Sequence, residues 1–181
     1  MEKFGKLRNI QTEELSLILS WRNEPKVREN MYTKHKISLD EHLAWWKTVQ
    51  NSDNQQYFMY ELNAIALGVV SFNQIDMQNH NSSWAFYASP EAPKGTGTKM
   101  EFLALNYAFT ELSLHKLCCE VLAFNTPVIK LHKKFGFQIE GILRDHHKNG
   151  ESFIDIYKLG ILSDEWTHKR DSMKAKLNKF S

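Results

Sequence analysis

The sequence has little cysteine, little net charge and no long apolar run, and each shortage excludes a class of protein. The two cysteines, Cys118 and Cys119, are adjacent. Neighbours in a strand point to opposite faces, so we expect no disulfide between them and no cysteine-based metal site. The net charge is only +2, and no basic stripe with interleaved aromatic residues is present, so nucleic acid is not expected as a partner. No apolar run approaches ~20 residues, which argues against a membrane partner.

What remains is the composition of an ordinary globular domain. Hydrophobic residues make up 42% of the chain and charged residues 24%, as is usual for proteins with one packed core. We expect a single domain over residues 1–181, with its core at about 4–162 and a charged tail at 163–181 that packs as a helix or frays. The first residues, MEKFGKLRNI, lack the apolar segment of a signal peptide, and reduced thiols suit the cytoplasm, so a cytoplasmic protein is expected.

Hydrophobic periodicity and turn residues predict strands and helices in the order β-α-α-β-β-β-α-β-α-β-β. Strands are expected at 4–10, 57–60, 67–75, 84–88, 115–124, 137–143 and 153–162, and helices are expected to begin near residues 12, 39, 96 and 127. Ser38 with Glu41 forms a capping box, and Asn149-Gly150 is typical of a hairpin turn. This order predicts an α/β domain with a largely antiparallel sheet.

A glycine loop stands between the strand at 84–88 and the following helix. It reads Gly95-Thr96-Gly97-Thr98, with Lys94 and Lys99 beside it. Glycines let the backbone approach a ligand, and the N–H groups of a first helical turn have no partner within the helix, so the loop suits a pyrophosphate. Met100 stands where the dinucleotide-binding fingerprint needs glycine, and the spacing of a P-loop is absent. A tight connection without a ligand remains the alternative.

Two motifs give this loop a context. Ala92-Pro93-Lys94-Gly95-Thr96-Gly97 matches the acetyl-CoA loop [Gln/Arg]-x-x-Gly-x-[Gly/Ala] except at Ala92. After the fifth strand, Asn125, Leu131, Lys134, Gly136 and Phe137 match a second motif, in which His132 replaces the usual Tyr. Together and in this order they resemble the GNAT superfamily of N-acetyltransferases. The resemblance implies a mixed α/β fold with a mostly antiparallel sheet of about seven strands, splayed between strands 4 and 5 and flanked by about four helices. It also implies acetyl-CoA as cosubstrate and no metal.

Narrower features resemble one branch, the acetyltransferases of pseudaminic acid biosynthesis. They are Trp21–Pro25, Met31-Tyr32, His42, Gly68–Ser71 and Phe86–Ala88. That branch acetylates the 4-amino group of UDP-4-amino-4,6-dideoxy-N-acetyl-β-L-altrosamine by direct transfer, in a pathway that serves flagellin glycosylation. The expected partners are therefore acetyl-CoA and a UDP-amino sugar, with a homodimer left open.

Two alternatives stay open at this point. Acetyltransferases of ribosomal-protein N-termini share similar beginnings and a segment like Glu140–Arg144, so an N-terminal or other small-amine acetyltransferase is the first. The second is a CoA-binding module without catalysis, which the replacement of the usual Tyr by His132 suggests.

The resemblance also implies site residues. The cofactor would be held by backbone and side-chain groups of Tyr87, Ala88, Lys94, Gly95, Thr96, Gly97, Thr98 and Asn125. The acceptor side would be lined by Arg22, Met31, Tyr32, His42 and Ser71. No carboxylate spacing supports a metal site at His146-His147.

Two residues are candidates for proton transfer. Glu120 lies in an otherwise mostly apolar strand, where partial desolvation would make a carboxylate a better base, acting directly or through water; an ion pair with a nearby Lys or Arg is the alternative. His132 is the candidate donor to the departing thiolate. A neutral imidazole is a poor acid and an ordinary imidazolium is the minority form at pH 7, so a packing role is the alternative.

Overall fold

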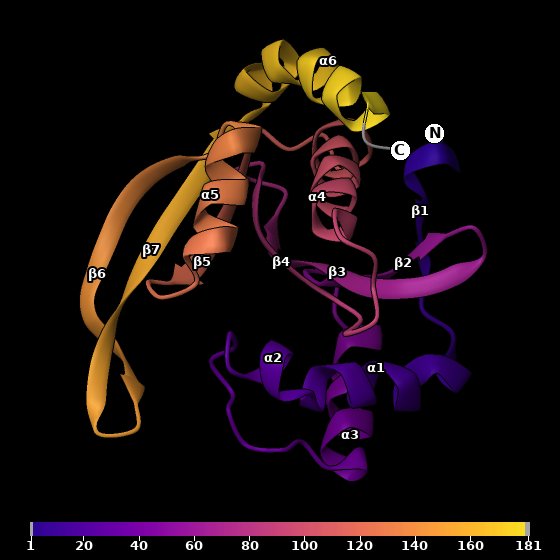
Figure 1. The fold of residues 1–181 in the computed structure, drawn as a ribbon, viewed down its shortest axis with the longest axis vertical. Helices are drawn as coiled ribbons and strands as arrows, with labels where there is room; N and C mark the ends of the chain where they lie inside the picture. Colours follow the sequence, from indigo (N-terminus) through magenta and orange to yellow (C-terminus); the bar gives the residue numbers. More distant parts are fainter. Residues whose placement is uncertain (1, 180–181) are drawn as a thin grey trace.

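The computed structural model describes residues 2–179, which form a seven-stranded sheet with helices around it (Figure 1). The strands are β1 (Lys6–Asn9), β2 (Gln56–Leu62), β3 (Ile65–Asp76), β4 (Asn81–Ala88), β5 (Lys116–Leu122), β6 (Gln138–Asn149) and β7 (Ser152–Leu162). The helices are α1 (Leu15–Asn23), α2 (Pro25–Arg28), α3 (Leu39–Gln50), α4 (Thr96–Asn106), α5 (Thr126–Phe135) and α6 (Ser163–Lys179), with short turns η1 (Glu2–Phe4), η2 (Thr12–Glu14) and η3 (Tyr107–Glu111). The mixed α/β class and the seven strands are confirmed, and α2 and α6 add to the four expected helices. None of the helices within residues 2–179 has the length and apolar character to cross a bilayer.

The sheet is divided at its only parallel pair. Its order is β1-β2-β3-β4-β5-β7-β6, and every neighbouring pair except β4–β5 is antiparallel. Strands β4 and β5 pair only from Asn81 with Lys116 to Ser83 with Cys118. Both strands continue beyond this point without pairing with each other, and in Figure 1 the β5-β7-β6 half swings away from β4. The predicted splay between strands 4 and 5 is thus confirmed.

Two apolar clusters fix the helices on opposite faces of the first half of the sheet. Phe58 and Tyr60 of β2 pack with α4 and α6 in the larger cluster. Met59, between them in sequence, packs with α1 and α3 in the smaller one. Successive residues of a strand point to opposite faces, so one strand can contribute to both clusters.

The charged tail packs as a helix. Within α6, Trp166, Met173 and Leu177 are buried against the larger cluster, while the charged residues between them are mostly exposed. This settles the open expectation for residues 163–179, and the last two residues of the tail lie outside the described part of the chain.

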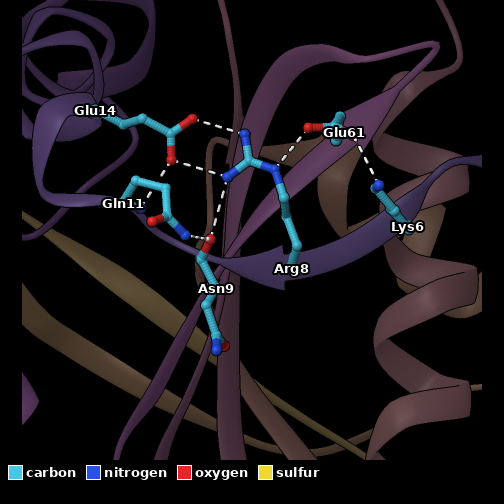
Figure 2. Close-up of polar contacts among 6 residues, drawn as sticks. All are labelled: Lys6, Arg8, Asn9, Gln11, Glu14 and Glu61. Carbon is cyan, nitrogen blue, oxygen red and sulfur yellow. Dashed lines mark hydrogen bonds and ion pairs between the residues drawn. The ribbon is translucent and has the colours of Figure 1, made fainter.

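A polar network joins the first strand to the first helix (Figure 2). The Arg8 guanidinium donates two hydrogen bonds to Glu14, at 2.6 and 2.9 Å, and one to Glu61 at 2.6 Å. Lys6 pairs with the other oxygen of Glu61 at 3.1 Å. Glu14 also accepts from the Gln11 backbone N–H, which completes a capping box at the turn that leads into α1. The hydrogen bonds from Arg8 lower the pKa of the Glu14 carboxyl.

Candidate active site

The divergence of β4 and β5 opens a cleft of about 340 Å³. One wall is Trp84–Ala88 of β4, and the opposite wall is Cys119–Leu122 of β5 with Asn125, Val128 and His132 at or within α5. Residues from Lys26 to Tyr32 close a third side. The edge of β4 that would face β5 has no strand partner here, so its backbone groups are available to a ligand.

A second cavity, of about 320 Å³, lies on the side of α1 and α3. It shares Met31, Ala85, Phe86 and Tyr87 with the cleft, so the two spaces meet at β4. Its other lining residues are Arg22, Thr33, Ile37, Glu41, His42, Trp45, Tyr57, Val69, Ser71 and Asn73. A donor in the cleft and an acceptor in this cavity, which we call the acceptor pocket, would approach each other at Phe86 and Tyr87.

The structure brings most of the predicted site residues to these two spaces. The cleft is lined by Met31, Tyr32, Tyr87, Ala88, Glu120, Asn125 and His132. The acceptor pocket is lined by Arg22, Met31, His42, Ser71 and Tyr87. Tyr32, expected on the acceptor side, lines the cleft instead, because its hydroxyl reaches across to β5. Among the predicted cofactor residues, Lys94 and Gly95–Thr98 line neither space.

The glycine loop forms the expected helix start beside the cleft. Gly95 precedes α4 with φ at +93°, a left-handed conformation that favours glycine, and α4 has no side-chain N-cap. The first-turn N–H groups of such a helix are available to an anion. A side chain at Gly97 would come within 3.2 Å of the Phe86 ring, which lines both spaces. The loop therefore adjoins the cleft at Phe86. A cofactor whose pyrophosphate is bound at the loop would extend from there into the cleft.

Glu120 lies in the cleft but its carboxylate is already engaged. Tyr32 Oη donates to Glu120 Oε2 at 2.6 Å, and Lys158 Nζ lies 3.2 Å from Oε1. The side chain keeps 37% exposure because it points away from the sheet face that buries its neighbours Cys119 and Val121. The ion pair considered as the alternative to a base role is therefore present. Burial and the bond to Glu120 raise the pKa of Tyr32.

His132 is hydrogen-bonded to a buried carboxylate that the sequence analysis did not identify. Its side chain is 3% exposed, and Nδ1 lies 2.9 Å from Oε1 of Glu101, a fully buried residue of α4. Burial raises the pKa of Glu101, and His132 partly offsets this. Glu101 Oε2 has no partner among the described residues. A carboxylate inside the apolar run Met100–Leu105 was the available signal, since ionised residues are rarely buried without a partner.

Arg22 and His42 bring unpaired polar atoms to the acceptor pocket. Arg22 Nη2 donates to the Thr33 carbonyl at 3.3 Å, whereas its Nη1 is buried with no partner within residues 2–179. Burial lowers the pKa of this guanidinium, because the charged form loses hydration. His42 is 4% exposed, lies 5.0 Å from the Trp45 ring and likewise leaves Nε2 unpaired. Burial lowers its pKa as well.

The segment 30–37 crosses from α2 to the far half of the sheet, and we call it the strap. Tyr32 bonds Glu120 and packs against the His147 ring at 5.3 Å. Lys34 donates to Asn149 and lies 5.4 Å from the centre of the Phe124 ring. The strap therefore ties the N-terminal helices to the β6–β7 hairpin across the mouth of the cleft. No group of three His, Cys, Asp or Glu side chains within the described residues is placed to hold a metal ion.

Comparison with known proteins identifies the relatives of this chain. Residues 7–157 match the model of the acetyltransferase (GNAT) domain. Acetyltransferase PseH of Campylobacter jejuni is 28% identical over 77% of this chain and 86% of that protein. Spermidine N(1)-acetyltransferase of Escherichia coli is 26% identical over 81% of this chain and 80% of that protein.

A solved structure shows the same fold. The spermidine N-acetyltransferase of Vibrio cholerae, in complex with CoA and spermine, superposes with a TM-score of 0.84 over 90% of this chain and 97% of that chain, at 22% identity. The names of these relatives agree on acetyl transfer, and of the proteins compared above only the spermidine acetyltransferases have an acceptor in their names.

Proposed function

Because the chain belongs to the GNAT acetyltransferase family and is an N-acetyltransferase that uses acetyl-CoA, we propose that its acceptor is an anionic nucleotide-linked amino sugar. The specific acceptor proposed is UDP-4-amino-4,6-dideoxy-N-acetyl-β-L-altrosamine, acetylated at its 4-amino group. The spermidine acetyltransferases among its relatives make a polyamine the competing candidate.

Nη1 of Arg22 carries this proposal, since it is buried without a partner among the described residues while Nη2 bonds the Thr33 carbonyl. Leaving a buried charged donor unsatisfied is costly, and an arginine fork matches the oxygens of a phosphate. Among the described residues that line the acceptor pocket, one has a carboxylate: Glu41, which pairs with His35 at 3.0 Å and is 48% exposed. A polyamine carries several positive charges and would meet Arg22 with little compensation, whereas a diphosphate would supply the missing partner.

The strap gives a second argument about acceptor shape. Met31, Thr33 and Ile37 of the strap line one side of the acceptor pocket, and the strap's contacts with Glu120 and Asn149 anchor it to the other half of the sheet. A peptide N-terminus needs an open groove along which its chain can leave the site. A bounded pocket supports a compact acceptor over the protein N-terminus considered as an alternative.

In the proposed reaction the amine attacks the thioester carbonyl directly. Backbone N–H groups on the unpaired edge of β4 near Tyr87 and Ala88 would bind the pantetheine arm and the developing oxyanion. Glu120, which lies 3.2 Å from Lys158 Nζ, would take the amine proton through water. Asn125 would contact CoA from the other wall of the cleft.

The test is an acceptor comparison. We expect CoA release from acetyl-CoA to be fast with the UDP-amino sugar and slow with spermidine and with a ribosomal N-terminal peptide. Arg22→Gln should raise KM for the sugar nucleotide by about 10- to 100-fold, the loss of a charged hydrogen bond, and leave KM for acetyl-CoA unchanged. In the same assay Glu120→Gln should lower kcat by about 10²-fold.

The matched control is Arg144→Gln, which removes an exposed arginine from β6 and should leave both KM values unchanged. Faster turnover of spermidine than of the sugar nucleotide would refute the acceptor proposal. An unchanged kcat in Glu120→Gln would remove that residue from the chemistry while leaving the acceptor assignment intact.

A further inference from the structure

Burying the Glu101–His132 pair costs desolvation free energy that a purely structural contact would not require. Glu101 is 0% exposed and His132 is 3% exposed, and the histidine ring lies among the rings of Trp84, Phe86 and Phe137. Buried ion pairs are often no more stabilising than apolar side chains of the same volume. Two apolar side chains would fill this position with a smaller desolvation penalty, which indicates that the polar pair has another role.

The hydrogen bond to Glu101 determines which ring nitrogen faces the site. Nδ1 is occupied at 2.9 Å, and no described residue bonds Nε2. His132 also lines the cleft between β4 and β5. Nε2 is therefore the ring nitrogen that remains for a bond to a ligand in the cleft. This arrangement parallels the general rule that the partner of one imidazole nitrogen sets the role of the other.

The pair must be treated as one titrating unit. When it holds two protons, one is shared between Glu101 and Nδ1 and the other sits on Nε2, whichever side of the hydrogen bond the shared proton occupies. This doubly protonated pair is electrically neutral, and losing the Nε2 proton leaves a buried negative charge. Because both side chains are buried, the electrically neutral form of the pair is favoured.

The surroundings of the pair contain few other charges. Cys119 of β5 is buried, and the Glu101 charge contributes to the raised pKa of its thiol. Glu120 of β5 lines the same cleft but is tied to Tyr32 and Lys158. On α5 itself, Lys133 and Lys134 are exposed. The rings on β4 carry no charge, so Glu101 is the charged side chain in contact with His132.

We infer that Glu101 and His132 form a dyad in which His132 donates the proton to the departing CoA thiolate and Glu101 is its positioning residue. The inference rests on the proposed function only in that an amine acceptor is acetylated. The amine nitrogen forms its bond to the thioester carbon, and the carbon–sulfur bond breaks. The sulfur takes the Nε2 proton as a thiol, and the shared proton moves onto Nδ1 with Glu101 as carboxylate. The proton lost by the amine reaches solvent, from which the dyad is recharged.

The dyad explains how a histidine can donate a proton where the family usually has tyrosine. A lone imidazolium is scarce at pH 7, but the neutral dyad keeps an N–H donor at Nε2 without a net charge. The replacement of tyrosine then no longer argues for a non-catalytic module.

The kinetic test varies the leaving group. With acetyl-CoA, Glu101→Gln and His132→Gln should each lower kcat by about 10²-fold. With S-(4-nitrophenyl) thioacetate as donor, whose acidic thiolate leaves without protonation, both variants should remain within about 3-fold of wild type. Glu91→Gln, an exposed carboxylate on the loop before α4, is the control and should match wild type with both donors. Equal losses with both donors would overturn the dyad and indicate a structural pair.

The amine in this assay is whichever acceptor the wild type acetylates, so a failed acceptor proposal leaves the test unchanged. Nitrogen-15 spectra of histidine-labelled protein bound to CoA give a readout without turnover, with His132→Gln identifying the signal. Nε2 of His132 should carry a proton at pH 7.5. An unprotonated Nε2 at that pH would refute the dyad whatever the variants show.

Discussion

Gly68 shows how closely a single position is packed beside the site. A Cβ atom at Gly68 of β3 would lie 2.7 Å from the Tyr87 carbonyl oxygen and 2.7 Å from the Met100 methyl carbon. The methyl can move aside, but the carbonyl belongs to the strand that lines both the cleft and the acceptor pocket. Gly68→Ala should therefore lower the free energy of unfolding by about 1–3 kcal/mol, measured by urea denaturation.

The matched control is Gly141→Ala on β6, where no heavy atom lies within 4 Å of the added Cβ. It should be neutral or stabilising by up to about 1 kcal/mol, because alanine restricts the unfolded chain. Equal effects at the two positions would show that the close approach at Gly68 is not what determines its tolerance.

Single residues of the site were predicted from the sequence more easily than their partners. Motif register placed Asn125 and His132 at the cleft, and both are found there. Glu101 was missed because its partner stands 31 residues away and no local pattern joins them. The contact of Tyr32 with Glu120 spans 88 residues and depends on the path of the strap. Such pairings arise from packing, which periodicity does not encode.

At the scale of elements, the Arg8 network makes the joint between β1 and α1 depend on pH (Figure 2). The Glu14 pKa is lowered in the folded state, so its contribution to stability is present above its unfolded pKa of about 4.3 and is lost as pH falls through the lower folded value. Arg8→Met should cost about 1–2 kcal/mol at pH 7, because it removes two hydrogen bonds to the partly buried Glu14 carboxylate and one to Glu61. The cost should shrink steadily below about pH 4.

Lys6→Met is the control for this joint, since Lys6 is 62% exposed and forms a surface ion pair. Its effect should stay below about 1 kcal/mol at every pH. Thermal unfolding of both variants between pH 3 and 7 provides the comparison. A cost of Arg8→Met that is constant across this range would contradict a charge-dependent joint.

Elements were predictable where a local rule fixes their ends. Ser38 caps α3 by accepting from the Glu41 N–H, although the Glu41 carboxylate pairs with His35 instead of closing the predicted capping box. Gly136 ends α5 with φ at +110°, as the sequence indicates. The hairpin turn forms next to the predicted Asn149-Gly150, but its two central residues are Gly150 and Glu151, because Asn149 still pairs with Ser152. The strand expected at 137–143 instead runs to Asn149, because β6 pairs with β7 again from His147 to Asn149 after an irregularity at 144–146. The π-helical turn Tyr107–Glu111 also has no signal in a period-3.6 pattern.

At the scale of the whole molecule, the division of the sheet was implied by family resemblance rather than by physical reasoning on the sequence. Two adjacent parallel strands normally pair along their length, and nothing in the apolar patterns of 84–88 and 115–124 forbids it. The structure limits pairing to three residue pairs. Beyond them, His132 of α5 packs against Trp84 and Phe86 of β4 and lines the cleft between the strands. The active cleft is thus a property of packing between the two halves.

This architecture predicts how the cofactor acts on stability. A ligand that bridges β4 and β5 binds only the folded chain, so acetyl-CoA at 100 times its Kd should add about 2.7 kcal/mol. For a chain of this size that corresponds to a rise in Tm of about 5–11 °C. Hydrogen exchange should slow at 84–88 and 119–122, whose facing edges lack strand partners, while β1, already paired with β2, should change little. A rise in Tm without protection at these two segments would place the cofactor elsewhere and overturn the assignment of the cleft.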